Sequence, residues 1–202
     1  MSKSYRDQRP RNLAVRKLGV MVNDEKPLPR IIVRKPRIGD GHPISCATLR
    51  GAIKSEVPLE YLYGLSRIEL RARNHEIGSP FGCYLIDEKT IVLYSLPLSL
   101  CWDEMMLSPI SIDHMRAFNA KITESAAGVK VCWPDEASLA MWFFFDVVCH
   151  EFGHHFRNQY KARHGVASYK HEEWIALIHS DRFYNQFLRR ISKKRLNKSY
   201  DK

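Results

Sequence analysis

The stretch that decides the fold is residues 134–156, which read PDEASLAMWFFFDVVCHEFGHHF. Proline suits the first turn of a helix and carboxylates favour its positive end, so Pro134 and the two acidic residues after it predict a helix start. No further proline occurs before Gly165, and residues 139–149 are apolar apart from Asp146. The stretch therefore predicts a long helix that is buried in the protein.

This helix carries the pattern H-E-x-x-H, with His150, Glu151 and His154 at its fixed positions. Residues four apart lie one turn apart on the same helix face, so the two imidazoles can reach one metal ion. A buried helix has little reason to carry such polar groups unless something binds them. We therefore predict a zinc site. Glu151 is its predicted general base, because zinc lowers the pKa of water to roughly 7 and a neighbouring carboxylate can take the proton during attack on a peptide carbonyl.

The third metal ligand is expected on a second helix. Residues 163–165 (Arg-His-Gly) are typical of a helix end, and Ser168 is a suitable cap for a helix from about 170 to 194. A short connection makes the two helices antiparallel neighbours. The candidate ligands on the second helix are Glu172, Glu173, His179 and Asp181.

Side-chain size favours Glu173 among these candidates. Glu173 shares a helix face with Ala176 and Ser180, at spacings of three and seven. Small residues on this face would let the second helix approach the first closely, opposite Gly153. We therefore predict Glu173 as the third ligand.

Counting along the two helices favours a different residue. At about 1.5 Å of rise per residue, two helices that run unbroken to the loop place His179 level with His154. Glu172 lies on the same face as His179, seven residues earlier. His179 and Glu172 therefore stay open as alternatives to Glu173.

Asp146 is the only charged residue in the apolar part of the first helix, one turn before His150. Metal-bound histidines usually donate their second ring N–H to a carboxylate or a carbonyl, which fixes the ring. We therefore expect Asp146 to orient a histidine of the zinc site.

The set of His150, Glu151 and His154, between an apolar helix and a carboxylate-bearing helix, resembles the zincin superfamily of metallopeptidases, and more narrowly its gluzincin branch. The resemblance covers roughly residues 134–190. It implies an α+β fold in which a small β-sheet or hairpin precedes the H-E-x-x-H helix, which an antiparallel C-terminal helix follows. It also implies Zn²⁺ as cofactor, a protein or peptide substrate, and a ligand glutamate some twenty residues beyond the second histidine, where Glu173 lies.

The pattern upstream of the helix changes from helical to extended. Residues 66–72 alternate between apolar and charged side chains, which predicts a strand. Residues 81–86 and 90–96 are aromatic and β-branched runs around a short polar turn, which predicts a hairpin. In the zincins the edge strand of the small sheet pairs with the substrate beside the zinc, so the resemblance gives one of these strands that part. The alternative for each strand is an ordinary place in the sheet.

The remaining segments carry no chemical motif. Residues 45–54 and 58–65 are predicted to form two short helices. Residues 96–133 are interpreted as an insertion of helix, loop and strand, with 129–133 extended. A further edge strand is suggested at residues 31–33.

Length and composition favour one domain with two tails. A chain of 202 residues with 45% hydrophobic content can bury a single core. We divide it into a basic, proline-containing N-terminal segment (1–43), a zincin-like domain (44–190) and a basic C-terminal tail (191–202). The longest apolar run has 11 residues, against the about 20 that a membrane span needs.

Cysteine usage and the N-terminus suggest a cytoplasmic protein. The first 17 residues are polar and basic, without the apolar run of a secretory signal. The five cysteines are odd in number and form no C-x-x-C pair, so we expect free thiols in a reducing compartment.

The positive charge of the chain lies at its two ends. Residues 1–38 hold 11 Lys/Arg and 3 Asp/Glu, and residues 185–202 hold 7 and 1, whereas the part between them holds 14 and 18. Basic segments of this kind bind nucleic acid or acidic partners, or serve as solvated tails, and both interpretations stay open. Zincin proteases of the Spartan type combine H-E-x-x-H with DNA binding and use a histidine as third ligand, which would be His171 or His179 here. The chain lacks their zinc-ribbon cysteines.

Two functions therefore follow from the sequence. The first is a zinc-dependent endopeptidase with His150, His154 and Glu173 as ligands and Glu151 as base. The second is a non-catalytic protein in which zinc stabilises the helix pair and the basic ends engage nucleic acid or an acidic partner. A fourth protein ligand that closes the zinc site would favour the second function, because catalytic zinc keeps an open position.

Overall fold

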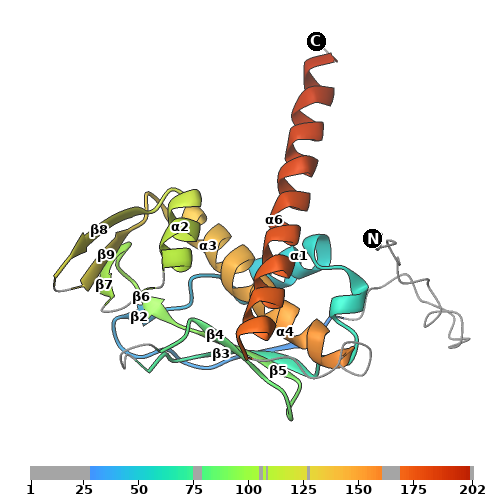
Figure 1. Cartoon of the computed structure of the whole chain (residues 1–202), viewed down its shortest axis with the longest axis horizontal. Helices are drawn as coiled ribbons and strands as arrows, with labels where there is room; N and C mark the ends of the chain where they lie inside the picture. Colours follow the sequence, from blue (N-terminus) through green and yellow to red (C-terminus); the bar gives the residue numbers. More distant parts are fainter. Residues whose placement is uncertain are drawn as a thin grey trace, which may run out of the picture.

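The computed structural model of the chain describes residues 28–74, 79–104, 107, 109–126, 128–160 and 169–200. Its central element is a helical run in which α3 (Glu136–Trp142), the π-helical segment η2 (Phe143–Val148) and α4 (Cys149–Gln159) follow one another directly (Figure 1). Asp135 caps α3, its side chain accepting a hydrogen bond of 2.6 Å from the backbone N–H of Ser138. The long buried helix expected from the sequence is confirmed, including its start.

A four-stranded sheet packs against this run and has the order β1-β3-β5-β4. β1 (Arg30–Val33) pairs parallel to β3 (Arg67–Arg71), and β3 pairs parallel to β5 (Thr90–Tyr94). β4 (Gly82–Leu85) pairs antiparallel to β5 across a tight turn, so the predicted hairpin is confirmed. β1 and β4 are the two edges, and the edge strand suggested at residues 31–33 is therefore present.

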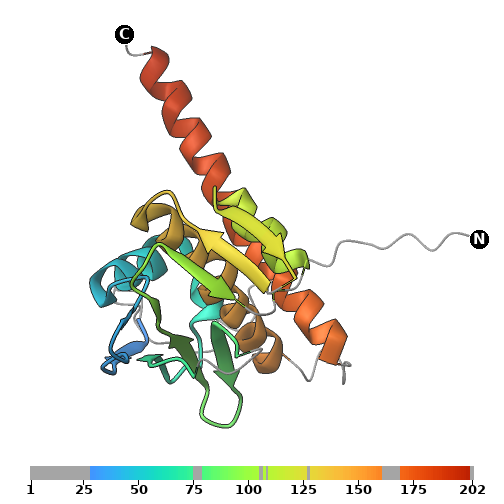
Figure 2. The same cartoon turned by 90° about the vertical axis from the view of Figure 1, so that its left-hand side faces the viewer.

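A second sheet forms within residues 96–133, the segment that was interpreted as an insertion. It comprises β7 (Cys101–Glu104), β8 (Lys121–Ser125) and β9 (Gly128–Cys132) in the antiparallel order β7-β9-β8. In Figure 1 it lies on the left beside α2 (Pro109–Ala117), and Figure 2 shows it facing the viewer. The extended segment expected at 129–133 is confirmed, but the other two strands were not predicted.

A disulfide joins Cys101 on β7 to Cys132 on β9. The two residues are paired directly across the strands, although 31 positions separate them along the chain. The expectation of five free thiols is therefore wrong for this pair, and holds for Cys46, Cys83 and Cys149. Sequence spacing could not reveal the pair because it depends on strand register.

Short elements complete the body of the protein. The first predicted short helix is confirmed as α1 (Cys46–Glu56), whereas the second, predicted at residues 58–65, forms only a three-residue 3₁₀ turn, η1 (Leu59–Tyr61). β2 (Asp40–Gly41) and β6 (Leu96–Pro97) form a two-stranded antiparallel ladder. Two strands thus lie within the predicted N-terminal segment 1–43 and pair with strands of the central domain.

The C-terminal helix α6 (Tyr169–Tyr200) crosses α4 and then leaves the body, as Figure 1 shows in red. Gly153 on α4 contacts Ala176, whereas Phe145, earlier in the run, packs on Phe187. Earlier residues of the central run therefore meet later residues of α6, which is the antiparallel arrangement expected. The predicted cap, Ser168, lies outside the described residues.

The core forms between the four-stranded sheet and the central run, with α6 on the far side of the run. Its largest fully buried side chains include Trp142, Phe143 and Phe152 from the run and Ile68 and Leu93 from the sheet. Within the described part of the chain, no helix has the length and apolar character that crossing a membrane requires.

Candidate metal centre

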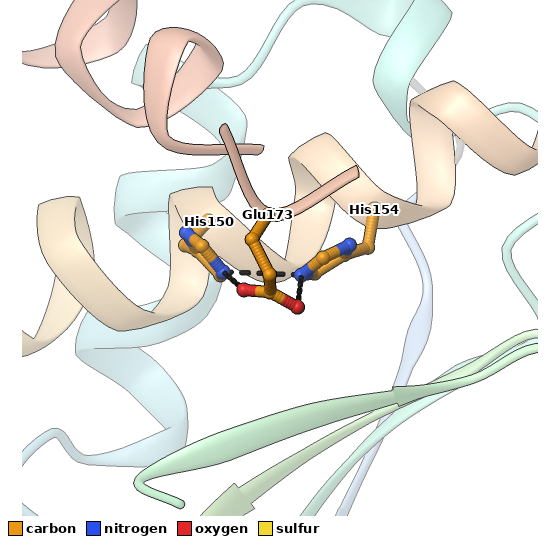
Figure 3. A group of neighbouring side chains, drawn as sticks. All are labelled: His150, His154 and Glu173. Atoms are coloured by element: carbon orange, nitrogen blue, oxygen red, sulfur yellow. Dashed lines mark hydrogen bonds and ion pairs between the residues drawn. The ribbon is translucent and has the colours of Figure 1, made fainter. Parts of the chain in front are cut away.

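Three ligand-type side chains from two helices converge at one point (Figure 3). His150 and His154 come from α4, and their Nε2 atoms are 3.0 Å apart. Glu173, in the first turns of α6, places one carboxylate oxygen 3.2 Å from Nε2 of His150 and the other 3.4 Å from Nε2 of His154. Within the ranges that the structure describes, this is the one group of at least three such residues whose ligand atoms approach closely enough to share an ion.

The close approach of the two helices brings Glu173 to the histidines. A Cβ atom added at Gly153 would lie 2.8 Å from Cα of Ala176 and 3.0 Å from its carbonyl oxygen, so only glycine fits. Ala176 is fully buried, and Ser180 donates a hydrogen bond of 2.7 Å from its hydroxyl to the carbonyl of Phe145. The structure thus contains the small-residue helix contact that was expected opposite Gly153.

The spacing of the three donors fits one metal ion. Zinc binds imidazole nitrogen and carboxylate oxygen at about 2.0–2.1 Å, and a tetrahedral shell of that size separates its ligand atoms by about 3.3 Å. The two imidazole nitrogens are 3.0 Å apart, and they lie 3.2 and 3.4 Å from the two different oxygens of the Glu173 carboxylate, which is close to that spacing. Two imidazoles and one carboxylate also form a donor set that leaves a fourth position open.

The electrostatics of the cluster favour a bound cation. Hydrogen bonds from His150 and then His154 hold the pKa of the Glu173 carboxyl well below its ordinary value. Burial, the largest single effect, disfavours the charged form of His154, but the hydrogen bond to Glu173 and the negative charges of Glu151, Glu173 and Glu172 together outweigh it and raise the pKa of that imidazole. The carboxylate therefore stays ionised and attracts positive charge, which a divalent ion supplies without protonating the rings.

Glu151 lies beside the cluster, buried between α4 and the sheet. Its side chain is 6% exposed, and its Oε2 atom has no hydrogen-bond partner among the described residues. Burial raises the pKa of this carboxyl, an effect that the neighbouring His150 and His154 oppose. Such a group binds a proton more readily than an exposed glutamate, as a general base requires.

A cleft of about 940 Å³ opens over the three ligands and Glu151. One wall is the edge strand β4, of which Gly82, Cys83 and Tyr84 line the space. A Cβ at Gly82 would lie 2.9 Å from the side chain of Val147 and 3.1 Å from that of Glu151, so glycine allows β4 to pack closely on the central run. The site therefore sits directly beside a sheet edge.

The remaining candidates have other partners. His179 packs with its ring on Tyr61 and accepts a hydrogen bond of 2.6 Å from that hydroxyl to Nδ1. Burial, aided by Arg182, lowers the pKa of His179 to about 4, so this half-buried histidine is neutral. Glu172 lines the cleft without joining the three converging donors.

The sequence suggested that Asp146 contacts a ligand histidine, but in the structure its partners are other residues. Its two carboxylate oxygens accept hydrogen bonds from Nδ1 of His114 and, at 2.9 Å, from Nε1 of Trp142. The expectation that Asp146 orients a histidine of the zinc site is therefore corrected, because α2 brings a different histidine to this carboxylate. His114 was not singled out from the sequence, since nothing in its local surroundings marks it.

His155 is a second residue that sequence reasoning missed. Its Nε2–H donates to the carbonyl of Tyr63 and its Nδ1 accepts from the hydroxyl of Tyr84, both at 3.0 Å. Burial lowers the pKa of this histidine, so it is neutral and both nitrogens are satisfied. His155 thus connects α4 to β4, the strand that lines the cleft.

Comparisons of the chain with models of protein families, with curated proteins and with solved structures find no match. The fold class that follows from the structure itself is α+β, with helices and small sheets. What the site does must therefore be argued from its own geometry.

Proposed function

We propose that this protein is a zinc-dependent metallopeptidase. The observation that carries the proposal is the convergence of His150, His154 and Glu173, at the separations of a zinc shell, beside the buried carboxylate of Glu151. The order of these groups along the chain agrees with the resemblance to gluzincins. Among the described residues three donors gather rather than four, and an open coordination position is what distinguishes catalytic from structural zinc.

The chemistry follows from the positions of the side chains. When bound, Zn²⁺ supplies Lewis acidity that lowers the pKa of water to roughly 7 and polarises a carbonyl. Glu151 takes one proton from the attacking water, whose oxygen forms the new bond to the peptide carbonyl carbon. The same carboxyl then gives this proton to the amide nitrogen as the C–N bond breaks, so that a carboxylic acid and an amine are released.

The sheet edge suits a peptide substrate. β4 pairs with β5 on one side, and in the described residues no strand covers its other side, which borders the cleft. An extended peptide can add to such an edge through main-chain hydrogen bonds, which give affinity with little sequence preference. Apolar side chains around the cleft, among them Phe81 and Leu177, supply contacts for side chains of the substrate.

The first test is metal content. Elemental analysis of the purified wild type should find about one zinc per chain, lost in Glu173→Ala and retained in His179→Ala. Loss in His179→Ala with retention in Glu173→Ala would overturn the ligand assignment, and no zinc in wild type after reconstitution would overturn the proposal.

The second test is cleavage. A library of quenched fluorescent peptides should be cut by wild type and not by Glu151→Gln, with zinc content equal in both. The competing function, a zinc-stabilised binding protein, predicts that chelation lowers the thermal midpoint while no peptide is cut, and that affinity for DNA falls steeply with salt.

A further inference from the structure

The disulfide between Cys101 and Cys132 closes a loop that carries one wall of the cleft. The two cysteines lie at the start of β7 and at the end of β9, 31 positions apart. Between them lies α2, beside the central run in Figure 1, so the disulfide joins the two ends of a segment, the closed loop (residues 101–132), that includes this helix. The residues of the closed loop that line the cleft are Leu107, Ser111 and His114.

Packed aromatic rings connect the disulfide to a second wall of the cleft. Trp102 and Trp133, the sequence neighbours of the two cysteines, are buried and stack with their ring centroids 6.3 Å apart. The ring of Trp133 also contacts that of Trp142 on α3, and Trp142 meets the ring of Phe81 edge-on, each pair with centroids 5.2 Å apart. Phe81 lines the cleft next to β4. Because a close-packed interior transmits strain, a displacement of β7 against β9 would reach the cleft from both sides.

Few buried side chains hold the sheet of the closed loop in place. Four of the five residues of β8 are exposed. Of the strand residues in this sheet whose side chains are described, Trp102 and Val131 alone are buried. Elements with few buried apolar contacts open at a low cost in free energy. The disulfide therefore fixes the start of the segment that leads from β7 to the cleft, whereas the fully buried Met115 of α2 fixes its end.

A reductant can reach this disulfide. Cys101 is exposed and Cys132 is half-buried. A thiolate of a dithiol can attack Sγ of Cys101 to form a mixed disulfide, while the protein S–S bond breaks and Cys132 leaves as a thiolate that takes up a proton. The second thiol of the dithiol then attacks its partner sulfur in the mixed disulfide and releases Cys101. The protein disulfide thus gains two electrons and two protons, and the dithiol becomes a disulfide.

We propose that the Cys101–Cys132 disulfide is a redox switch of the cleft: the oxidised form holds the α2 wall in the position that binds a peptide substrate, and reduction weakens substrate binding. This inference rests on the proposed peptidase function. Coupling between two sites of a protein typically changes affinity about 5- to 150-fold. The bond-breaking step should change less, because the metal ligands and Glu151 come from α4 and α6 and lie outside the closed loop.

Steady-state kinetics on a peptide cut by wild type provide the main test. The oxidised protein is compared with protein reduced by a water-soluble phosphine, which becomes its oxide with an oxygen from water and is used because thiolates bind zinc. KM should rise about 5- to 150-fold on reduction, with kcat changed little. Zinc content, measured on the same samples, should remain about one per chain.

Two variants separate the disulfide from other effects of the phosphine. Cys101→Ser combined with Cys132→Ser should show the raised KM with and without phosphine. Cys46→Ser is the matched control, because Cys46 is a free thiol at the start of α1 and does not line the cleft. The KM of this control should respond to phosphine as that of wild type does.

Linkage distinguishes a switch from a merely structural disulfide. If the oxidised form binds peptide more tightly, bound peptide must stabilise the disulfide by the same factor. The midpoint potential, measured in glutathione buffers on Glu151→Gln to prevent turnover, should therefore become more negative when peptide is added at saturation. A tenfold preference corresponds to about 30 mV. Circular dichroism at both ends of the titration should show a folded protein.

The outcomes distinguish the two levels of the proposal. If wild type binds zinc and cuts peptide but reduction changes KM less than twofold, the switch is refuted and the peptidase stands. A midpoint potential that peptide leaves unmoved, or a reduced protein that is unfolded at the assay temperature, also refutes the switch, because the disulfide is then structural only. If wild type binds no zinc or cuts no peptide, the peptidase proposal fails, and the switch fails with it.

Discussion

Replacing Gly153 by alanine tests whether the close contact of α4 and α6 builds the metal site. The new Cβ would lie 2.8 Å from Cα of Ala176, whereas carbon atoms rest at about 3.5 Å or more, so the two helix backbones must separate by roughly 0.7 Å. The Cβ is attached rigidly to the backbone of α4 and the Cα belongs to the backbone of α6, so no flexible side chain can yield instead. Overpacking of this kind costs about 1–3 kcal/mol, against which the better helix propensity of alanine returns about 1 kcal/mol at most.

The metal site should respond more strongly than stability. Ligand positions in a zinc shell tolerate about 0.2 Å, and Glu173 moves with α6. We expect zinc affinity to fall about 10- to 100-fold, the range seen when the supports of metal ligands are changed. Chelator competition measures this affinity, and urea unfolding followed by circular dichroism measures stability.

Gly51 is the matched control for this substitution. It lies inside α1, and an added Cβ would meet nothing within 4 Å. Gly51→Ala should therefore raise the free energy of unfolding by about 0.5–1 kcal/mol and leave zinc affinity unchanged. If Gly153→Ala behaves in the same way, the helix contact does not position Glu173 and the reasoning is refuted.

Three further predictions concern Glu151, His179 and the disulfide between Cys101 and Cys132. Glu151→Gln should lower kcat by at least about 10²–10⁴-fold while zinc content, measured on the same sample, stays equal to wild type. The pKa of His179 is about 4 in the folded protein and about 6.5 in the unfolded chain. Between these two pH values the unfolded chain therefore binds a proton that the folded protein does not. The contribution of His179 to the free energy of unfolding should be complete above pH 6.5 and decline towards pH 4. His179→Gln should flatten that decline in urea titrations with chelator in both samples, and an unchanged slope would contradict it. Removing the disulfide by Cys101→Ser should lower the free energy of unfolding by about 2–4 kcal/mol, whereas Cys46→Ser, at a free thiol, should change it little; equal effects would count against the pairing.

The sequence predicted those parts of the fold that local patterns determine. The helix start at Asp135 and the β4–β5 hairpin depend on residues a few positions apart, and both were correct. The two arguments about the third ligand disagreed because one assumed that both helices run unbroken to the loop. α4 ends at Gln159 and α6 begins at Tyr169. His154 thus lies five residues before the end of α4, and Glu173 lies four residues after the start of α6. These distances correspond to roughly 7.5 and 6 Å of helical rise, so the two residues are nearly level.

The parts that were missed depend on contacts between distant segments. Asp146 was recognised as an unusual carboxylate in an apolar helix, but its partner could not be named, because His114 is 32 residues away on a helix whose packing no local pattern reveals. The same holds for Cys101 and Cys132, which meet only once β7 and β9 pair in register. Such partners require the tertiary structure, whereas the unusual residue itself is visible in the sequence.

Two buried side chains on α4, His155 and Glu151, differ in whether their polar atoms have hydrogen-bond partners. His155 is fully buried, and both of its nitrogens have hydrogen-bond partners, so its burial costs little and its function is to hold β4 on α4. Glu151 is nearly as buried, yet one of its oxygens has no partner among the described residues. An unsatisfied buried carboxylate lowers stability, and proteins retain such groups where the free lone pair has a task. Glu151 also lines the cleft that holds the three converging ligands, which supports the proposal that it accepts the proton of an attacking water.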